Sequence, residues 1–202
     1  LPPMVNWPAD FSETIGDQIH LIKGGYEYDG RCISPLDERE IARVAKKLSA
    51  DGIDAIAISG VFSPVNGDME ARAAEIVQQE LPDASITLSS KIGRIGLLER
   101  ENAGIMNACL NAFALKVISS FRQALTQLNI SAPFFISQND GTLMKAAFVE
   151  KYPVLTFASG PTNSMRGAAY LSSVEDALVV DIGGTTTDIG MLVKGFPRES
   201  SV

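Results

Sequence analysis

Histidine and cysteine are scarce in this chain, and their scarcity excludes several kinds of active site. His20 is the only histidine among the 202 residues, so the chain by itself holds neither a Ser-His-Asp triad nor a multi-histidine zinc site. The two cysteines, Cys32 and Cys109, are far apart in sequence and form no CxxC pair. We therefore expect both thiols to be reduced and buried, as is usual in a cytoplasmic protein.

The chain also lacks clusters of positive charge and long apolar runs. Its formal net charge is -7, and an acidic chain without a Lys/Arg cluster predicts neither a nucleic-acid partner nor an anionic membrane partner. We see no apolar run long enough to span a bilayer and no signal peptide at the start. Hydrophobic residues make up 46% of the sequence, which is ordinary for a folded globular protein.

The two ends carry no closing elements. The first residue is Leu1 rather than Met, and residues 200–202 follow shortly after an apparent hairpin. We therefore expect an internal segment of a longer protein. Its length suffices for one large domain or two small ones, and we place a boundary near Leu110, inside a long helical stretch.

Apolar segments alternate with amphipathic segments, a pattern typical of α/β proteins with a parallel or mixed sheet covered by helices. Ser34 and Pro35 are suited to the N-cap and first position of a helix, which Asp51-Gly52 would end. Before this helix Gly24-Gly25 and Asp29-Gly30 predict turns between short strands. The remaining segments predict helices at 69–81, 97–129 (one or two, with Gly104 as the weak point), 142–149 and 161–171, and strands at 53–59, 85–89, 133–137, 154–158, 177–182 and 188–193, of which we expect 53–59 and 177–182 to be central.

Residues 181–188, DIGGTTTD, concentrate groups that suit a phosphate and its metal ion. An apolar strand ends at Asp181, and Gly183-Gly184 follows, where a backbone without Cβ atoms can bring its N–H groups close to a polyphosphate. Threonine hydroxyls can donate to phosphate oxygens, and aspartates hold Mg²⁺, often through its waters. A plain hairpin tipped by Gly-Gly is the alternative, but it needs no aspartate on each side. The remaining candidate residues of the turn are Thr185, Thr186, Thr187 and Asp188.

This turn resembles the phosphate-binding hairpin of the actin/Hsp70/sugar-kinase superfamily of ATPases. In that superfamily a helix opened by a small-residue loop precedes the strand, and Ser159 and Gly160 fit that loop. The small residues 167–169, Gly-Ala-Ala, would allow the helix to pack closely. The alternative is a core helix with Pro161 at its first position.

Three stretches together resemble the hydantoinase A/5-oxoprolinase family: residues 97–110 (LLERENAGIMNACL), residues 138–144 (QNDGTLM) and residues 159–188. The resemblance implies that residues 1–110 are the end of the family's N-terminal domain and residues 111–202 the start of its main domain. It implies ribonuclease-H-like domains with ATP between them, each supplying one phosphate turn. The other turn would precede residue 1, so we expect the isolated chain to be inactive.

The reaction implied by the resemblance is the ATP-dependent opening of a cyclic amide such as hydantoin or 5-oxoproline. Asp181 would orient Mg²⁺ or the attacking group, while the N–H groups of Gly183, Gly184 and Thr185 would hold phosphate oxygens. The rest of the turn, residues 186–188, would set its shape. The family resemblance also implies a cytoplasmic enzyme, with a second hydantoinase subunit or a further copy of itself as the possible protein partner.

Several alternatives stay open at this point. Asn139 and Asp140 follow a strand and could face a substrate cleft, or they could simply form an Asp-Gly turn. The charged run at residues 99–101 is expected to be a solvated helix face. The function could instead be that of a sugar or small-molecule kinase, of an acetone-carboxylase-like subunit, or of a non-enzymatic ATPase like actin or a chaperone.

Overall fold

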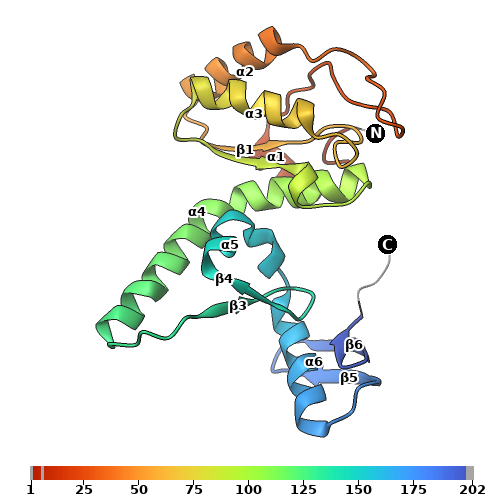
Figure 1. Ribbon diagram of the computed structural model, residues 1–202, viewed down its shortest axis with the longest axis vertical. Coiled ribbons are helices and arrows are strands. Elements are labelled where there is room, and N and C mark those ends of the chain that lie inside the picture. The colour runs from red at the N-terminus through yellow and green to blue at the C-terminus, as the bar shows by residue number, and fades with distance from the viewer. Residues whose placement is uncertain (1, 6, 199–202) are drawn as a thin grey trace. The chain divides into compact units, whose positions relative to one another are not determined.

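The computed structural model describes residues 2–5 and 7–198, which form two compact units (Figure 1). Unit 1 comprises Leu1–Asn111 and unit 2 comprises Ala112–Val202. The division lies beside the boundary expected near Leu110. Helices and strands occur in both units, which confirms the α/β class.

Unit 1 is a small parallel sheet between helices. Strands β1 (Ala55–Ile58) and β2 (Ser85–Leu88) pair in parallel, from Ala55 opposite Ser85 to Ile58 opposite Leu88. Figure 1 shows α2 and α3 on one side of this sheet and the start of α4 on the other. The helices and short helical turn of unit 1 are α1 (Ala9–Ile15), α2 (Glu38–Ala50), α3 (Asp68–Glu80), η1 (Ser89–Lys91) and the first part of α4 (Leu97–Gln127).

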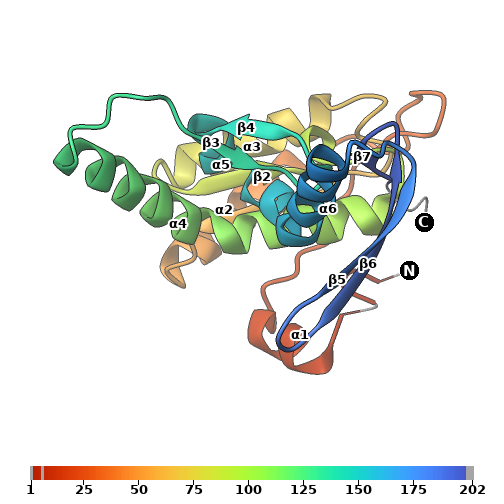
Figure 2. The ribbon, with the colours of Figure 1, turned by 90° about the horizontal axis from the view of Figure 1, so that it is seen from below.

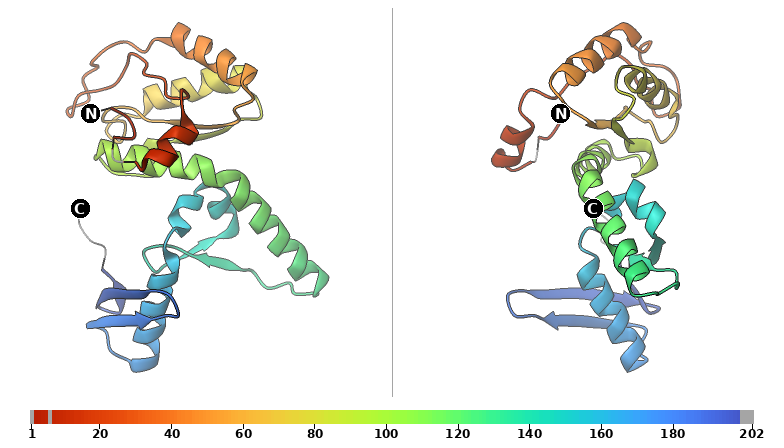
Figure 3. Two further views of the ribbon diagram at one scale, coloured as in Figure 1. Left: turned by 180° about the vertical axis from the view of Figure 1, so that it is seen from behind. Right: turned by 90° about the vertical axis from the view of Figure 1, so that its left-hand side faces the viewer.

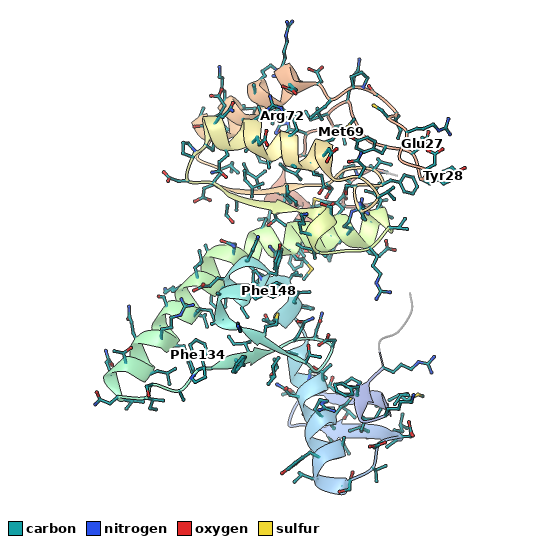
Figure 4. The ribbon with its side chains drawn as sticks, viewed as in Figure 1. Glu27, Tyr28, Met69, Arg72, Phe134 and Phe148 are labelled. Atoms are coloured by element: carbon teal, nitrogen blue, oxygen red, sulfur yellow. The ribbon has the colours of Figure 1, made fainter. Side chains whose placement is uncertain are left out.

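Helix α2 shows how the sequence pattern becomes packing. Its apolar residues recur at helical spacing and are buried against β1 and α3; they are Ile41, Val44, Ala45 and Leu48. Each fully buried aliphatic side chain of this kind contributes about 1.5–3 kcal/mol. The predicted start at Ser34 is wrong, because Asp37 is the residue that caps the helix by accepting a hydrogen bond from the Glu40 amide at 3.1 Å. Arg72 of α3, labelled in Figure 4, bridges to Glu38 at 2.8 Å.

The N-terminal segment is tied to α4. The Trp7 indole donates to the Asn102 side chain at 2.6 Å, and the Met4 amide donates to the Glu101 carboxylate at 3.1 Å. Helix α1, which the sequence did not predict, follows this attachment and is the short red helix in both views of Figure 3. The turn expected at Asp29-Gly30 is present, since Gly30 has a φ of +84° and its amide donates to the Glu27 carbonyl.

Unit 2 combines an antiparallel pair of strands with a helix and a hairpin. Strands β3 (Phe135–Ser137) and β4 (Leu143–Lys145) pair, and the second sheet has the order β5-β6-β7 (Figure 2). Ile118 of α4 packs in a core with Met144, Ala146 and Val149, and Phe121 packs on Phe134 (Figure 4) with ring centroids 4.8 Å apart. The remaining elements are α5 (Ala146–Lys151), η2 (Pro153–Thr156), α6 (Ser159–Ser172), β5 (Ala177–Ile182), β6 (Thr187–Val193) and β7 (Phe196–Pro197).

Several predicted elements of unit 2 are wrong. Residues 143–145 form a strand and not the start of a helix, because they pair with β3. Residues 153–156 form a 3₁₀ turn in place of a strand, with Pro153 fixing its first position. Helix α6 begins at Ser159, so Pro161 is its third residue. Strand β5 has the predicted bounds but lies at the edge of its sheet, and β1 belongs to a two-stranded sheet, so neither is central.

Residues 97–127 form one continuous helix, α4, which settles one open alternative, and two other expectations about this region are corrected. Gly104 does not break it, because this glycine is buried with the Ser89 side chain close by.

An 18-residue window of α4 has a mean hydropathy of 1.3, so by length and composition alone the helix could cross a membrane. Core helices of water-soluble proteins meet the same criterion, but the expectation that no run was long enough is wrong. Cys109 on α4 and Cys32 are free thiols, and both are exposed rather than buried.

Candidate functional site

The hairpin of β5 and β6 presents residues 181–188 as a turn between two carboxylates. Asp181 pairs with Asp188 across the strands, and Ile182 pairs with Thr187, so residues 183–186 form the turn. The Gly183 amide donates to the Thr186 carbonyl at 2.9 Å and closes it. All four turn residues are exposed. Their backbone is therefore accessible to a ligand.

The two aspartates face each other on one side of the hairpin. Directly opposed residues of antiparallel strands have Cα atoms about 4.5–5.5 Å apart, and like charges in that arrangement destabilise the pair. Both side chains are half-buried, so water screens the repulsion only in part. A hydrated divalent cation would relieve it, and two carboxylates together with phosphate oxygens are a ligand set that Mg²⁺ uses. Among the described residues no cluster of three or more potential metal-binding side chains occurs.

Helix α6 covers the face of the hairpin that carries the aspartates. Gly190 lies on this face, and a Cβ atom added there would stand 2.1 Å from the Met165 methyl group. Leu192, on the same face, is buried. The opposite face is exposed and apolar, with Leu178, Val180, Ile182, Ile189 and Met191. The carboxylates are thus held on the helix-covered side of the hairpin.

Close packing between helix and hairpin comes from residues that sequence reasoning missed. The small residues expected to allow it, 167–169, do not do so: Gly167 has open space around it, and no described residue of α6 is buried. Gly190 makes the approach possible instead. Its signal in the sequence was a lone glycine inside a strand, which often marks a close backbone approach. Arg166 adds a second link, since it donates to the Gly195 carbonyl and stacks over the Phe196 ring.

Ser159 and Gly160 form the first turn of α6. Ala158 precedes them in a left-handed conformation with φ of +57°. The Thr162 hydroxyl donates to the Ser159 carbonyl at 2.9 Å, and Gly160 has open space around it. Among the described residues no hydrogen bond or ion pair joins Ser159 or Gly160 to the hairpin turn. The structure therefore shows an accessible helix start but does not link it directly to Asp181.

The turn containing Asn139 and Asp140 is built mainly from its own side chains. The Asp140 carboxylate accepts from the Thr142 amide at 2.8 Å and from the Thr142 hydroxyl at 2.6 Å. Its other oxygen accepts from the Gln138 side chain at 3.3 Å. Gly141 has a φ of +83° and packs against Pro197 and Arg166. These contacts favour the turn interpretation for Asp140. The backbone N–H of Asn139 donates to the Leu155 carbonyl.

Unit 1 contains a buried charged network that contradicts the expected solvated helix face at Arg100, although Glu99 beside it is exposed as expected. Arg100 is 1% exposed and Glu70 is 2% exposed. The Arg100 Nε donates to the Ser89 hydroxyl at 2.9 Å, and that hydroxyl donates to Glu70 at 2.6 Å. The Glu70 carboxylate also accepts from the amides of Gly60 at 2.8 Å and Ser90 at 3.0 Å. We call this the Glu70–Ser89–Arg100 network.

The pKa values of this network follow from its burial and hydrogen bonds. Burial alone would raise the pKa of Glu70, but hydrogen bonds from Ser89, Ser90 and Ser63 outweigh it and hold the pKa below its ordinary value. Burial lowers the pKa of Arg100. Sequence reasoning missed this network because Glu70 and Arg100 lie in runs of charged residues on helices, a pattern that usually marks a solvated face.

An α/β protein with an acidic, glycine- and threonine-rich hairpin is the class that the fold and site define. The sequence model described as Hydantoinase/oxoprolinase matches residues 100–201, and the one for the Hydantoinase/oxoprolinase N-terminal region matches residues 9–81. The chain belongs to the hydantoinase/oxoprolinase family, which confirms the resemblance.

Named relatives point to more than one activity within this family. The chain is 27% identical over 179 residues to the caprolactamase alpha subunit of Pseudomonas jessenii, covering 85% of this chain and 26% of the relative. It is 26% identical over 192 residues to the acetophenone carboxylase gamma subunit of Aromatoleum aromaticum, and the match covers 90% of this chain and 26% of the relative. The crystal structure of ATP-dependent caprolactamase from Pseudomonas jessenii superposes with a TM-score of 0.75 at 26% identity, and the match covers 84% of this chain and 25% of that structure's chain. The chain thus spans about a quarter of the length of these relatives.

Proposed function

We propose that this chain is part of an ATP-dependent amidohydrolase that opens a cyclic amide, and that its β5–β6 hairpin holds the phosphates of ATP with Mg²⁺. The observation that carries the proposal is the pair Asp181 and Asp188, opposed on one face beside an exposed Gly-Gly-Thr-Thr turn. The family membership and the relative described as an ATP-dependent caprolactamase support it.

The chemistry explains why ATP is required. An amide carbonyl is a poor electrophile, and transfer of the γ-phosphoryl group to its oxygen would make the carbon easier to attack. Water would add to this carbon and the ring nitrogen would leave as the amine when the C–N bond breaks. A second water would then hydrolyse the resulting acyl phosphate and release inorganic phosphate. Phosphoryl transfer depends mainly on positioning and charge neutralisation. Bound Mg²⁺ would neutralise phosphate charge. In this chain Asp181 would hold the metal's waters, and the amides of Gly184 and Thr185 would donate to phosphate oxygens, as backbone nests do for anions. The Gly183 amide, which was also expected to do so, donates to the Thr186 carbonyl instead and closes the turn.

The other parts of the chain have supporting roles in this proposal. Thr186, Thr187 and Asp188 would shape the turn, and the N-terminus of α6 at Ser159 and Gly160 would offer backbone donors to an anion. We assign residues 1–110 to the end of the family's N-terminal domain and residues 111–202 to the start of its main domain. We further infer ribonuclease-H-like domains, a cytoplasmic location, and a second subunit or a further copy as partner in the longer enzyme.

A carboxylase-like subunit is the second candidate, because the acetophenone carboxylase gamma subunit is as similar to this chain as the caprolactamase subunit is. Both activities could use the same phosphate hairpin, since activation by phosphoryl transfer suits an amide oxygen and an enolate oxygen alike. The hairpin alone does not choose between them.

Phosphate release by the intact enzyme separates the candidates. Caprolactam, 5-oxoproline, hydantoin and acetophenone with bicarbonate would be supplied one at a time, and the organic product would be identified by mass spectrometry. Substrate-stimulated phosphate release with a ring-opened product supports the proposal. A carboxylated product supports the second candidate. A stable phosphorylated product would identify a kinase, and ATP hydrolysis that no substrate stimulates would favour an actin- or chaperone-like ATPase; either result would contradict both.

A further inference from the structure

The second half of α4, which lies in unit 2, has one buried face and one exposed face. On the buried face Ile118 is 1% exposed and packs in the core with Met144 and Val149, and Figure 1 shows β3, β4 and α5 beside this part of the helix. Along the exposed face runs a groove of about 410 Å³. We call it the α4 groove, and its lining residues are Phe113, Lys116, Val117, Ser120, Phe121 and Ala124.

All six residues of the α4 groove are exposed to solvent. Phe113 is 66% exposed and Phe121 is 51% exposed, although the second ring also packs on Phe134. Lys116 carries the only charge in the groove. Single exposed apolar side chains are common, whereas a contiguous apolar stripe rimmed by polar residues is typical of a protein–protein contact.

Four residues form the centre line of this groove, and their spacing is that of a helix-pairing surface. They are Phe113, Val117, Ser120 and Ala124, separated by 4, 3 and 4 residues. Core positions recur at this spacing in helix pairs that cross at about 20°. The order of spacings is the same when the helix is read backwards. The order of sizes is not, because the two larger side chains come first and the two smaller ones last.

Reversal of the helix therefore places large side chains opposite small ones. In an antiparallel pair with a twofold axis between residues 118 and 119, Phe113 of one copy lies level with Ala124 of the other. Val117 then lies level with Ser120, and the symmetry repeats both pairings. Facing layers that alternate large and small residues pack at the density of a protein core. In a parallel pair each residue would meet its own copy, so Phe113 would face Phe113.

We propose that the α4 groove is the contact surface of a homodimer, in which the α4 helices of two copies pack antiparallel about a twofold axis. The matched order of large and small residues is a property that self-pairing requires and that an unrelated partner does not. Charge also permits this pairing, since the two copies of Lys116 would be displaced by about 7.5 Å along the helix axis. The inference concerns unit 2 and does not depend on the proposed nucleotide chemistry.

The size of the contact sets the expected strength of the dimer. The four layers from Phe113 to Ala124 span only about 16 Å of helix. A helix contact of this length buries less than the about 1,000 Å² of total surface that a stable interface exceeds. We therefore expect a dimer that forms at micromolar concentration and that a single substitution in the groove disrupts.

Sedimentation equilibrium of the 202-residue chain and of the longer protein, from about 1 to 200 µM, tests the dimer. Val117→Glu should weaken it at least about 10-fold, because the contact would bury two carboxylates. Leu115→Glu is the matched control: Val117 is 43% exposed and Leu115 is 46% exposed, but Leu115 lies outside the groove. A monomer throughout this range, or equal effects of the two substitutions, overturns the proposal. A dimer of the shorter chain that is absent from the longer protein also overturns it, since the rest of the polypeptide would then cover the groove.

Ala124→Leu separates a specific dimer from non-specific association. This substitution adds apolar surface to the groove, but the added atoms meet Phe113 of the other copy. Overpacking of a matched contact should weaken the dimer. Stronger association of Ala124→Leu would instead show that the groove is merely adhesive, and would contradict the proposed pairing.

Cross-linking tests the antiparallel register directly. Cys32→Ser and Cys109→Ser remove the exposed thiols, and Phe113→Cys or Ala124→Cys then gives each chain one thiol. A short bismaleimide should join the two variants when they are mixed. Neither variant should react with itself, because identical positions would lie about 16 Å apart along the helix axis. Self-linking of either variant, which a parallel pair would give, or no linking in the mixture overturns the proposal.

Discussion

The two groups of charged residues in this molecule are built in opposite ways. In unit 1 the Glu70–Ser89–Arg100 network is almost fully buried, and the Glu70 carboxylate and the Arg100 guanidinium each have several hydrogen-bond partners. In unit 2 Asp181 and Asp188 carry the same sign, face each other and lie beside an exposed turn. Buried charges that have all their hydrogen-bond partners fix a structure. Two like charges that face each other at a turn instead suit the binding of a ligand that is not part of the chain.

The buried network fixes the loops that follow the two parallel strands. Gly60 follows β1, and Ser89 follows β2; Glu70 and Arg100, from α3 and α4, bind both. The guanidinium also caps the loop before α4 by donating to the carbonyls of Arg94, Ile95 and Gly96. Among the described residues, the turn at residues 183–186 has one hydrogen bond outside the strand ladder, from the Gly183 amide to the Thr186 carbonyl.

The largest expected effect is on the network. Arg100→Met should destabilise unit 1 by about 3–5 kcal/mol, because it leaves the buried Glu70 charge and several carbonyls without donors. Urea unfolding followed by circular dichroism would measure this. Arg72→Met is the matched control, since Arg72 forms exposed ion pairs, which contribute little to stability. Equal losses of stability in the two variants would show that the buried network contributes no more than the exposed ion pairs of Arg72.

Asp181 offers the corresponding test in unit 2, in the intact enzyme. Asp181→Asn should keep the fold, because the side chains are similar in size, and should lower turnover by about 10²–10³, equivalent to about 2.7–4 kcal/mol of lost transition-state stabilisation. Asp188→Asn should cost less, since we expect Asp188 to act mainly on the turn's shape. Turnover and Tm are measured on the same sample. A folded Asp181→Asn enzyme with wild-type turnover ends the metal-site proposal.

The dependence of unfolding free energy on pH, measured at acid pH, tests the contribution of Glu70 to the buried network. The pKa of Glu70 is lowered in the folded state, so its contribution is present above the unfolded pKa of about 4.3 and is lost as pH falls through the lower folded value. Unfolding free energy measured from pH 6 to pH 2.5 should therefore fall more steeply below about pH 4.3 in the parent chain than in Glu70→Gln. Parallel curves would mean that Glu70 titrates alike in both states.

Local patterns predicted much of this fold, and long-range contacts account for the errors. The β5–β6 hairpin and the helix at 68–80 depend on neighbours in sequence, and they were predicted nearly to their bounds, as was the end of α2. The strand at 143–145 has only three residues and exists because it pairs with β3. No local signal distinguishes it from the start of the helix that follows.

The same limit applies to the sites. The hairpin could be singled out because all its chemical groups lie within residues 181–188. The network could not, because Glu70, Ser89 and Arg100 come from three elements and only the fold brings them together. A charged residue on a helix is usually solvated, so nothing in the sequence marked Arg100 as buried.

Gly190 tests whether helix packing positions the carboxylates. Gly190→Ala places a methyl group 2.1 Å from the Met165 methyl, and we expect a loss of about 1–3 kcal/mol, typical of overpacking. Met165→Ala in the same chain should recover part of it. Gly184→Ala is the control, because a Cβ atom there meets open space and should change stability by less than about 0.5 kcal/mol. Thermal unfolding of the parent chain and the three variants would measure these effects, and no recovery in the double variant would argue against the contact.

The smallest expected effect carries the sharpest contrast between stability and function. In the 202-residue chain without Mg²⁺ or nucleotide, Asp181→Asn should raise stability by about 0.2–1 kcal/mol, because it removes one of two like charges directly opposed across the strands. The gain should shrink as salt is added, since screening weakens the repulsion that the substitution removes. Asp176→Asn is the control: this carboxylate lies outside the hairpin pair and accepts from the Lys194 amide, so its loss should not stabilise the chain. The same Asp181→Asn change would then stabilise the hairpin while it lowers turnover in the intact enzyme, which is what a site that stores repulsion for a cation requires. If Asp181→Asn instead destabilises the ligand-free chain at every salt concentration, the carboxylate supports the turn, and the cation has no repulsion to relieve.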